Sequence, residues 1–207
     1  MLPVRPTPHL RPPFGLQATQ ATDFFPEWTL PPLTSNAALT ESEQLALDRA
    51  KANFTDMMAA PPVLENSVKL VILAPLLDLA GFYRWPYRLE TEPSIEIEAE
   101  EDDVVVRGRI DVLVLKEQLW LLVIESKRSD FAVTRALPQA LAYMLGSNSG
   151  QRPTYGMITN GNEFLFLKTV KTPTPEYGNS RLFSLVNPGN ELHDVLQILK
   201  TMGTALT

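Results

Sequence analysis

The stretch RGRIDVLVLKEQLWLLVIESKR, from Arg107 to Arg128, decides the fold of this chain. Two apolar runs, Ile110–Leu115 and Leu119–Ile124, lie on either side of a polar break at Lys116-Glu-Gln118. Apolar runs of this length, separated by a short polar break, are typical of two strands joined by a tight connection. The sequence therefore predicts a β-hairpin over this stretch.

Three charged residues lie at the open end of the predicted hairpin. Side chains alternate faces along a strand, so Glu125 and Lys127 are expected to point the same way. A hairpin folded at about Gln118 brings Asp111 opposite Glu125 across the strand pair. Two carboxylates and an ammonium at the end of apolar strands are costly unless a bound cation shares them. The pattern therefore indicates a candidate metal site.

These residues resemble the motif of the PD-(D/E)xK nuclease superfamily, which has an acid on one strand and Asp/Glu-x-Lys on the next. Here the motif reads Ile110-Asp111 and then Glu125-Ser126-Lys127, with isoleucine in place of the proline. The resemblance implies that Asp111, Glu125 and the backbone carbonyl of Ser126 bind Mg²⁺, for which Mn²⁺ substitutes. It also implies that Lys127 orients the attacking water and helps to deprotonate it.

The segment Leu64–Phe82 resembles the first helix of the nuclease domain in type I restriction enzyme R subunits. That helix has an acid at its start, followed by an apolar stretch with a proline, paired leucines and a glycine. Glu65 matches the acid, which makes it a further candidate catalytic residue. A second interpretation stays open, because an acid at a helix N-terminus also interacts favourably with the helix dipole.

A third element lies downstream of the hairpin, at Gln139-Ala-Leu-Ala-Tyr143. It resembles the Q-x-x-x-Y element of RecB-like and type I restriction nuclease domains. Arg135, Gln139 and Tyr143 are spaced by four residues, so they are predicted to share one helix face. The resemblance implies that Gln139 organises the site, that Tyr143 stacks on DNA or contacts a phosphate, and that Arg135 contacts the DNA backbone. Arg128 is a further candidate nucleic-acid contact.

Composition limits the chemistry that the chain can use. Its 207 residues contain no cysteine and only two histidines, so thiolate metal sites are excluded and histidine-based hydrolysis has little to draw on. The formal net charge is −6, which splits into −9 over residues 1–103 (7 basic, 16 acidic) and +3 over residues 104–207 (11 basic, 8 acidic). The half with the candidate site is therefore the half better suited to a phosphate substrate.

The remaining segments predict one domain after an irregular arm. Residues 1–36 are rich in proline and read as an arm whose Phe24, Phe25 and Trp28 are able to dock on the body or on a partner. Residues 37–207 read as a single domain. Its expected elements are a capped helix over 40–58, a helix over 64–80 kinked or split at Pro75, a strand over 94–99, the hairpin, a helix with Arg135, Gln139 and Tyr143, a strand pair at 154–158 and 163–167, and a helix over 190–202 closed by Gly203. The start of the helix with Gln139 is left open, because Pro138 fits only in a first turn.

The fold class that follows is α/β (α+β), a restriction-endonuclease-like core with a central mixed sheet flanked by helices. The segment Tyr155–Asn162 is also similar to a strand and turn of the type I family, so the resemblance covers roughly Glu65 to Lys168. It implies a metal-dependent DNA endonuclease in restriction or phage defence. The alternative is a catalytically silent DNA- or protein-binding subunit, with hydrolysis of RNA or a nucleotide as a weaker third. A homodimer or a defence-complex partner, no membrane association and a cytoplasmic location are expected.

Overall fold

A computed structural model describes residues 16–19, 24, 38–99, 104–116, 119–147, 152–171 and 175–204, without the side chains of 95–99, 104–107 and 119–123. The helical elements are α1 (Glu41–Met57), α2 (Glu65–Val68), the π-helical turn η3 (Lys69–Leu73), α3 (Ala74–Leu79), the 3-10 turn η4 (Val133–Ala136), α4 (Leu137–Leu145) and α5 (Leu192–Thr204). The strands are β1 (Gln17–Ala18), β2 (Tyr87–Thr91), β3 (Ser94–Ala99), β4 (Val104–Arg109), β5 (Val112–Lys116), β6 (Leu119–Ser126), β7 (Thr154–Thr159), β8 (Glu163–Val170), β9 (Glu176–Asn179) and β10 (Phe183–Ser184).

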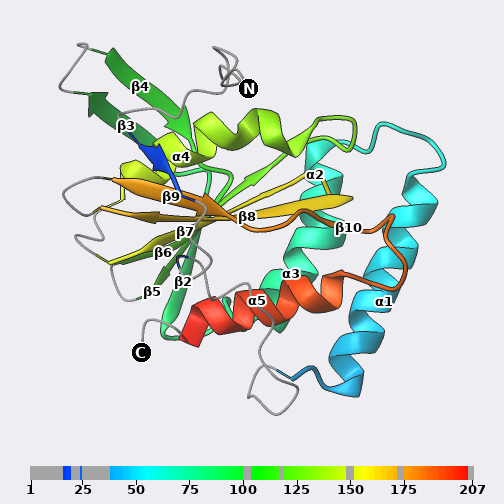
Figure 1. Cartoon of the computed structure of the whole chain (residues 1–207). Helices are drawn as coiled ribbons and strands as arrows, with labels where there is room; N and C mark the ends of the chain where they lie inside the picture. The colour runs from blue at the N-terminus through cyan, green and yellow to red at the C-terminus, as the bar shows by residue number, and fades with distance from the viewer. Residues whose placement is uncertain are drawn as a thin grey trace, which may run out of the picture.

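The main sheet is mixed, as the sequence predicted. Its strands follow the order β1-β9-β8-β7-β6-β5-β2, with β10 paired to β8. The β6–β7 and β1–β9 pairs are parallel and the other pairs of this sheet are antiparallel. Strands β3 and β4 form a separate two-stranded ribbon. Figure 1 shows α1, α3 and α5 on one side of the main sheet and α4 on the other. The expected class, a mixed sheet flanked by helices, is confirmed.

Two apolar cores lie on opposite faces of this sheet. Val112 and Val114 of β5 belong to the core formed with α1, α3 and α5, whereas Leu113 between them belongs to the core under α4. Strand β7 alternates in the same way, with Met157 in the first core and Ile158 in the second. Neighbouring strand residues point to opposite faces, so these central strands are buried on both sides.

Helix α1 begins where the sequence placed it. The hydroxyl of the N-cap Thr40 accepts from the N–H of Glu43, and the Glu43 carboxylate accepts from the N–H of Thr40. This reciprocal capping box satisfies two helix donors that would otherwise lack partners. Leu47, Ala50 and Phe54 form the buried face of the helix.

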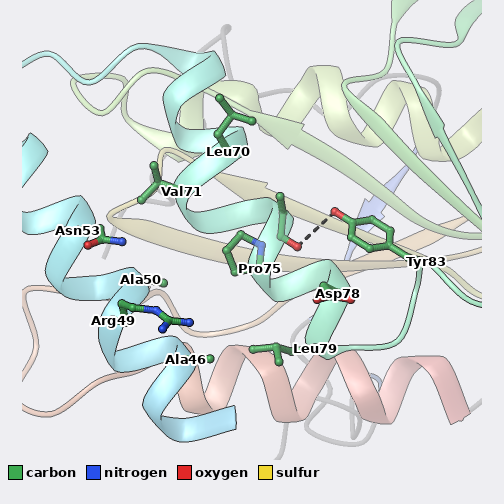
Figure 2. A pocket seen from close by; sticks show the side chains of 11 residues that line it. Ala46, Arg49, Ala50, Asn53, Leu70, Val71, Pro75, Asp78, Leu79 and Tyr83 are labelled. Carbon is green, nitrogen blue, oxygen red and sulfur yellow. Dashed lines mark hydrogen bonds between the residues drawn. The ribbon is translucent and has the colours of Figure 1, made fainter. Parts of the chain in front are cut away.

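The second predicted helix contains a π-turn rather than a simple bend. It stays helical from Glu65 to Leu79, and in η3 the N–H of Ala74 donates to the carbonyl of Lys69. Pro75, which has no N–H to donate, lies in the first turn of α3. Val68, Ile72 and Leu76 lie on the buried face of this stretch, whereas Leu70 is 73% exposed. Figure 2 shows this stretch beside α1, with Tyr83 donating to the carbonyl of Ala74 at 3.2 Å.

Both predicted strand pairs are present with small shifts of their ends. Strand β5 begins at Val112, so Ile110 and Asp111 precede it, and β6 extends through Ser126. A register shift lies between Val114 and Leu115. Residues 117 and 118 of the predicted break lie outside the described residues. Strands β7 and β8 meet at Asn160-Gly161, where Gly161 has a φ of +86°. Only glycine adopts such a φ without strain.

Two predictions about helices need correction. The helix that contains Gln139 and Tyr143 begins at Leu137, with Pro138 in its first turn, so Arg135 belongs to the preceding 3-10 turn η4 rather than to the same helix. Gly203 lies inside α5 and does not close it. Its carbonyl accepts from the Tyr87 hydroxyl at 2.7 Å, and a Cβ at this position would lie 2.9 Å from that hydroxyl. Gly203 thus permits close packing of α5 on β2.

The described part of the proline-rich segment, predicted to be an irregular arm, contributes an edge strand to the main sheet. Gln17 and Ala18 of β1 pair with β9, and Leu16 is buried in the core under α4. Phe24 packs against the other core and beneath the Lys168 ammonium, which is one of the two docking alternatives, whereas Phe25 and Trp28 lie outside the described residues. None of the helices in the described part of the chain is long and apolar enough to span a membrane.

Candidate active site at the open end of the hairpin

The open end of the β5–β6 hairpin brings the predicted acids together. Val112 pairs with Ile124, so Asp111 and Glu125 are the next residues on the two sides of the pair. Asp111 carbonyl accepts from the N–H of Glu92, which follows β2, and Lys127 donates its N–H to Thr159 of β7 at 2.8 Å. Neighbouring strands on both sides therefore fix the backbone of the motif.

Asp111 is held through both of its carboxylate oxygens. Its Oδ2 accepts from the Ser126 N–H at 2.7 Å and from the Ser126 hydroxyl at 3.2 Å. Its Oδ1 accepts from the Lys69 ammonium at 2.9 Å. Ser126 thus orients the first acid through its N–H and its hydroxyl, while the expected metal contact of its carbonyl stays a prediction.

Glu125 is buried with one oxygen unsatisfied. The side chain is 2% exposed, Oε1 forms an ion pair with Lys127, and Oε2 has no hydrogen-bond partner in the part of the chain that the structure describes. Burial raises the pKa of Glu125 to about 7, and the negative charges of Asp111 and Glu65 add to this against the opposing effect of Lys127. An unpartnered buried carboxylate oxygen is costly, so this oxygen marks a position suited to a cation.

Lys69 is a site residue that sequence reasoning missed. Its ammonium lies 2.9 Å from Glu65 and 2.9 Å from Asp111, and it therefore links the helix that carries Glu65 to the hairpin. Burial lowers the pKa of Lys69, but the hydrogen bonds from its ammonium to Asp111 and Glu65 outweigh this and raise the pKa above its ordinary value. The i,i+4 spacing of Glu65 and Lys69 was the available signal, yet it gave no hint of the contact with Asp111.

Gln139 and Tyr143 form a supporting pair on α4. Gln139 donates through Nε2 to the Tyr143 hydroxyl at 2.9 Å. The Tyr143 ring is 4% exposed, and a Cβ on Gly108 of β4 would lie 2.4 Å from its hydroxyl. The ring is enclosed between α4 and β4 in this structure, and the DNA or phosphate contact implied for Tyr143 stays a prediction. Its observed role is to pack the ribbon β3–β4 against α4.

The two predicted arginines lie outside the ion-pair network of the acids. Arg128 is exposed and donates through Nε and one terminal nitrogen to Asp130, at 3.1 and 2.6 Å. This contact raises the pKa of Arg128 and lowers that of Asp130. Arg135 is exposed on η4. Both side chains are accessible to a polyanion, although Arg128 would have to exchange Asp130 for a phosphate.

The donor set fits a hard divalent cation that keeps part of its water shell. Among the described residues, no group of three or more Asp, Glu, His or Cys side chains is arranged to hold a metal. Mg²⁺ is commonly bound by one or two carboxylates and several waters. Asp111 and the free Oε2 of Glu125 supply such a pair of oxygens, with Lys127 beside them.

Two hollows lie near the π-turn, and one of them reaches the site. A cavity of about 210 Å³ includes Lys69 and Asp111 in its wall, together with Leu73, Leu89 and other mostly apolar side chains. A second, of about 520 Å³, lies between α1 and the η3–α3 segment and is shown in Figure 2. The second hollow is lined by none of the predicted site residues, whereas the first is lined by Asp111 and its partner Lys69.

Comparison with known proteins assigns the chain to a family. The mixed sheet with helices on both faces is a restriction-endonuclease-like fold, and residues 38–174 match the family described as the type I restriction enzyme R protein N terminus. The chain belongs to this family and is a restriction-enzyme-related nuclease domain.

The solved structures similar to the chain include a fragment described as an HsdR subunit of a type I restriction enzyme from Vibrio vulnificus YJ016. The two are 20% identical with a TM-score of 0.41, and the match covers 67% of this chain and 26% of that one. The chain thus spans about a quarter of the length of that relative. A comparison with curated proteins finds no significant match.

Proposed function

We propose that this chain is a metal-dependent endonuclease domain that hydrolyses phosphodiester bonds of DNA at Asp111, Glu125 and Lys127. The observation that carries the proposal is the buried Glu125 carboxylate, whose Oε2 has no partner among the described residues although Asp111 and Lys127 lie beside it. A structural ion pair would be expected to use both oxygens. A site that receives a cation needs one of them free.

The proposed cofactor is Mg²⁺, with Mn²⁺ as a substitute, held by Asp111 and Glu125. A divalent ion at this point would polarise the phosphate and stabilise the charge that develops during hydrolysis. Water adds to phosphorus, one P–O ester bond breaks, and the leaving oxygen takes up a proton to become a hydroxyl. The carbonyl of Ser126 is proposed as a further oxygen ligand.

In this scheme, side chains of the protein position the attacking water and the metal ligands and assist proton transfer. The Lys127 ammonium forms an ion pair with Glu125, and the Lys127 N–H donates to Thr159 of β7. These two contacts hold the lysine beside the proposed metal ligands. We assign to it the orientation of the attacking water and help in its deprotonation. Ser126 holds Asp111 by two hydrogen bonds and keeps the carboxylate at the end of the hairpin. Gln139 is proposed to support the site from α4.

The decisive experiment is the nicking and linearisation of supercoiled plasmid with Mg²⁺ or Mn²⁺. Glu125→Gln and Lys127→Met are compared with wild type and with Glu43→Gln, an acid that is paired to Lys200 far from the hairpin end. We expect each site variant to reduce cleavage at least about 100-fold and the control to leave it unchanged. Circular dichroism checks that the variants are folded.

The contrary outcome would favour the second function. Wild-type protein that is folded but cleaves neither plasmid nor single-stranded DNA nor RNA, alone or with other restriction subunits, would identify the chain as a non-catalytic subunit. Membership of the type I restriction enzyme R family supports a role in restriction, and we propose that the domain acts on DNA within a larger assembly. Cleavage that appears only when other restriction subunits are added would support both parts of the proposal.

A further inference from the structure

The Lys69 ammonium occupies a position between two acids of the site. It lies 2.9 Å from Glu65 on its own helix and 2.9 Å from Asp111 Oδ1 at the hairpin end. Its side chain is 20% exposed, so it is neither locked in the core nor free in solvent. A charged side chain in that position competes with any other cation that approaches the same oxygens.

The hydrogen bonds of Asp111 define which oxygen is contested. Oδ2 already accepts two hydrogen bonds from Ser126, one from the N–H and one from the hydroxyl. Oδ1 accepts from Lys69. A cation shared between Asp111 and the free Oε2 of Glu125 would therefore most readily take the oxygen that Lys69 now holds.

We propose that Lys69 is the resident cation of the metal-free site and that a divalent ion binds by displacing its ammonium from Asp111. The inference rests on the proposed function, because it assumes a metal at Asp111 and Glu125. It assigns to Lys69 a role in setting metal affinity, and it explains why Glu65 lies at the start of α2: Glu65 retains the released ammonium near the site.

The charges of the cluster support displacement over coexistence. Glu65, Asp111 and Glu125 carry three formal negative charges when ionised, and Lys69 and Lys127 carry two positive charges. An ammonium and a divalent ion on the same oxygen, Asp111 Oδ1, repel each other strongly in a partly buried site, whereas Lys127 and the ion would use different oxygens of Glu125. The lysine side chain is long and flexible, and Glu65 gives it a second partner on the same helix. Leaving Asp111 thus costs it only one of its two contacts.

The test is Mn²⁺ binding, measured by the loss of the free-ion electron paramagnetic resonance signal. Wild type is compared with Lys69→Met, and Lys200→Met is the matched control. Lys200 also has a 20% exposed side chain paired to a glutamate, Glu43, but lies on α5. Glu125→Gln reports whether the bound ion is at the proposed site.

We expect Lys69→Met to bind Mn²⁺ about five- to tenfold more tightly than wild type, and Lys200→Met to bind it equally well. An unchanged or weaker affinity in Lys69→Met would overturn displacement. If Glu125→Gln still removes binding in that case, the proposed metal site survives and only this inference fails. If neither wild type nor Lys69→Met binds Mn²⁺, both proposals fail together.

A measurement on the wild-type protein makes the test independent of the variant's folding. The side-chain ¹⁵Nζ resonance of Lys69, assigned by its loss in Lys69→Arg, is followed during a Mg²⁺ titration. Displacement predicts that this resonance shifts in proportion to metal occupancy while that of Lys200 stays in place. A Lys69 resonance that is unaffected at saturating Mg²⁺ would contradict the proposal.

Discussion

Two partly or fully buried glutamates in this molecule have opposite electrostatic environments. Glu191, near the start of α5, accepts from Arg181 at 2.7 Å, from the Ser184 N–H at 2.6 Å and from the Asn187 amide at 2.9 Å. Glu125, at the hairpin end, has Lys127 on one oxygen and no partner on the other among the described residues. The two glutamates differ in the hydrogen-bond donors that surround their carboxylates.

The pKa values follow from these donors. Burial raises the pKa of Glu191, but the Ser184, Arg181 and Asn187 contacts outweigh it and bring the pKa below its ordinary value. At Glu125 the burial is deeper and the donors are fewer, so the pKa is raised to about 7. The hydrogen bonds to Glu191 suit a structural carboxylate, whereas the missing partner of Glu125 suits a carboxylate that binds a ligand.

The largest effect is expected on DNA cleavage, which should depend on the acids near Glu125 and not on those near Glu191. Asp111→Asn removes a proposed metal ligand and the partner of Lys69, so Mg²⁺-dependent plasmid cleavage should fall about 10²- to 10³-fold. Asp194→Asn removes a partner of Arg181 in the Glu191 neighbourhood and should leave cleavage unchanged. Equal cleavage by Asp111→Asn and wild type would contradict the proposed role of Asp111 as a metal ligand.

Stability should respond in the opposite order. Glu191→Gln leaves donors of Arg181, Ser184 and Asn187 incompletely matched, so the free energy of unfolding should fall by about 1–3 kcal/mol. Glu125→Gln removes a buried charge with an unsatisfied oxygen and should change it by less than about 1 kcal/mol in metal-free buffer. Urea unfolding at pH 8 measures both. A larger loss at Glu125 than at Glu191 would show that the hairpin acids are structural.

Glu43 extends the comparison to pH. Burial raises its pKa, but the hydrogen bonds from Lys200 and the Thr40 N–H outweigh this and lower the pKa below the ordinary 4.5. A lowered pKa means that the ionised carboxylate stabilises the fold above about pH 4.5 and that this contribution is lost as pH falls through the lowered value. Glu43→Gln should therefore cost about 1 kcal/mol at pH 7 and progressively less below pH 4.5. A pH-independent difference in thermal unfolding would argue against this ion pair.

The smallest effect is expected at Arg128. Its pair with Asp130 is exposed, so Arg128→Gln should leave the unfolding temperature unchanged. If the side chain contacts a phosphate, the variant should bind duplex DNA more weakly and reduce the salt dependence by about one ion. Fluorescence anisotropy at several salt concentrations measures the slope. If the dependence of DNA affinity on salt concentration is the same in Arg128→Gln and wild type, Arg128 does not contact a DNA phosphate.

The hairpin and its acids were predictable from sequence because local patterns determine them. Apolar runs with a polar break fix the strands, and the pairing of Val112 with Ile124 then fixes which residues meet at the open end. The capping box at Thr40 and the turn at Asn160-Gly161 are likewise local devices. Each depends on residues only a few positions apart.

What sequence could not supply depends on packing between distant segments. The contact of Lys69 with Asp111 joins residues 42 positions apart, and it requires α2 to lie against the hairpin. Gly203 was predicted to end the last helix, but it lies inside α5 and its carbonyl accepts a hydrogen bond from Tyr87. Arg135 appeared to continue the face of Gln139 until the 3-10 turn separated them. The π-turn before Pro75 was likewise not predicted from the sequence, which indicated only a kink or a break at the proline.

The most direct test of the account is an anomalous difference map from crystals of the wild-type protein soaked in Mn²⁺. We predict a peak between Asp111 and Glu125 Oε2, with no comparable peak near Glu191, whose oxygens are already satisfied. A map without a peak at the hairpin end, at a Mn²⁺ concentration that supports cleavage, would contradict the claim that the unsatisfied glutamate marks the metal site.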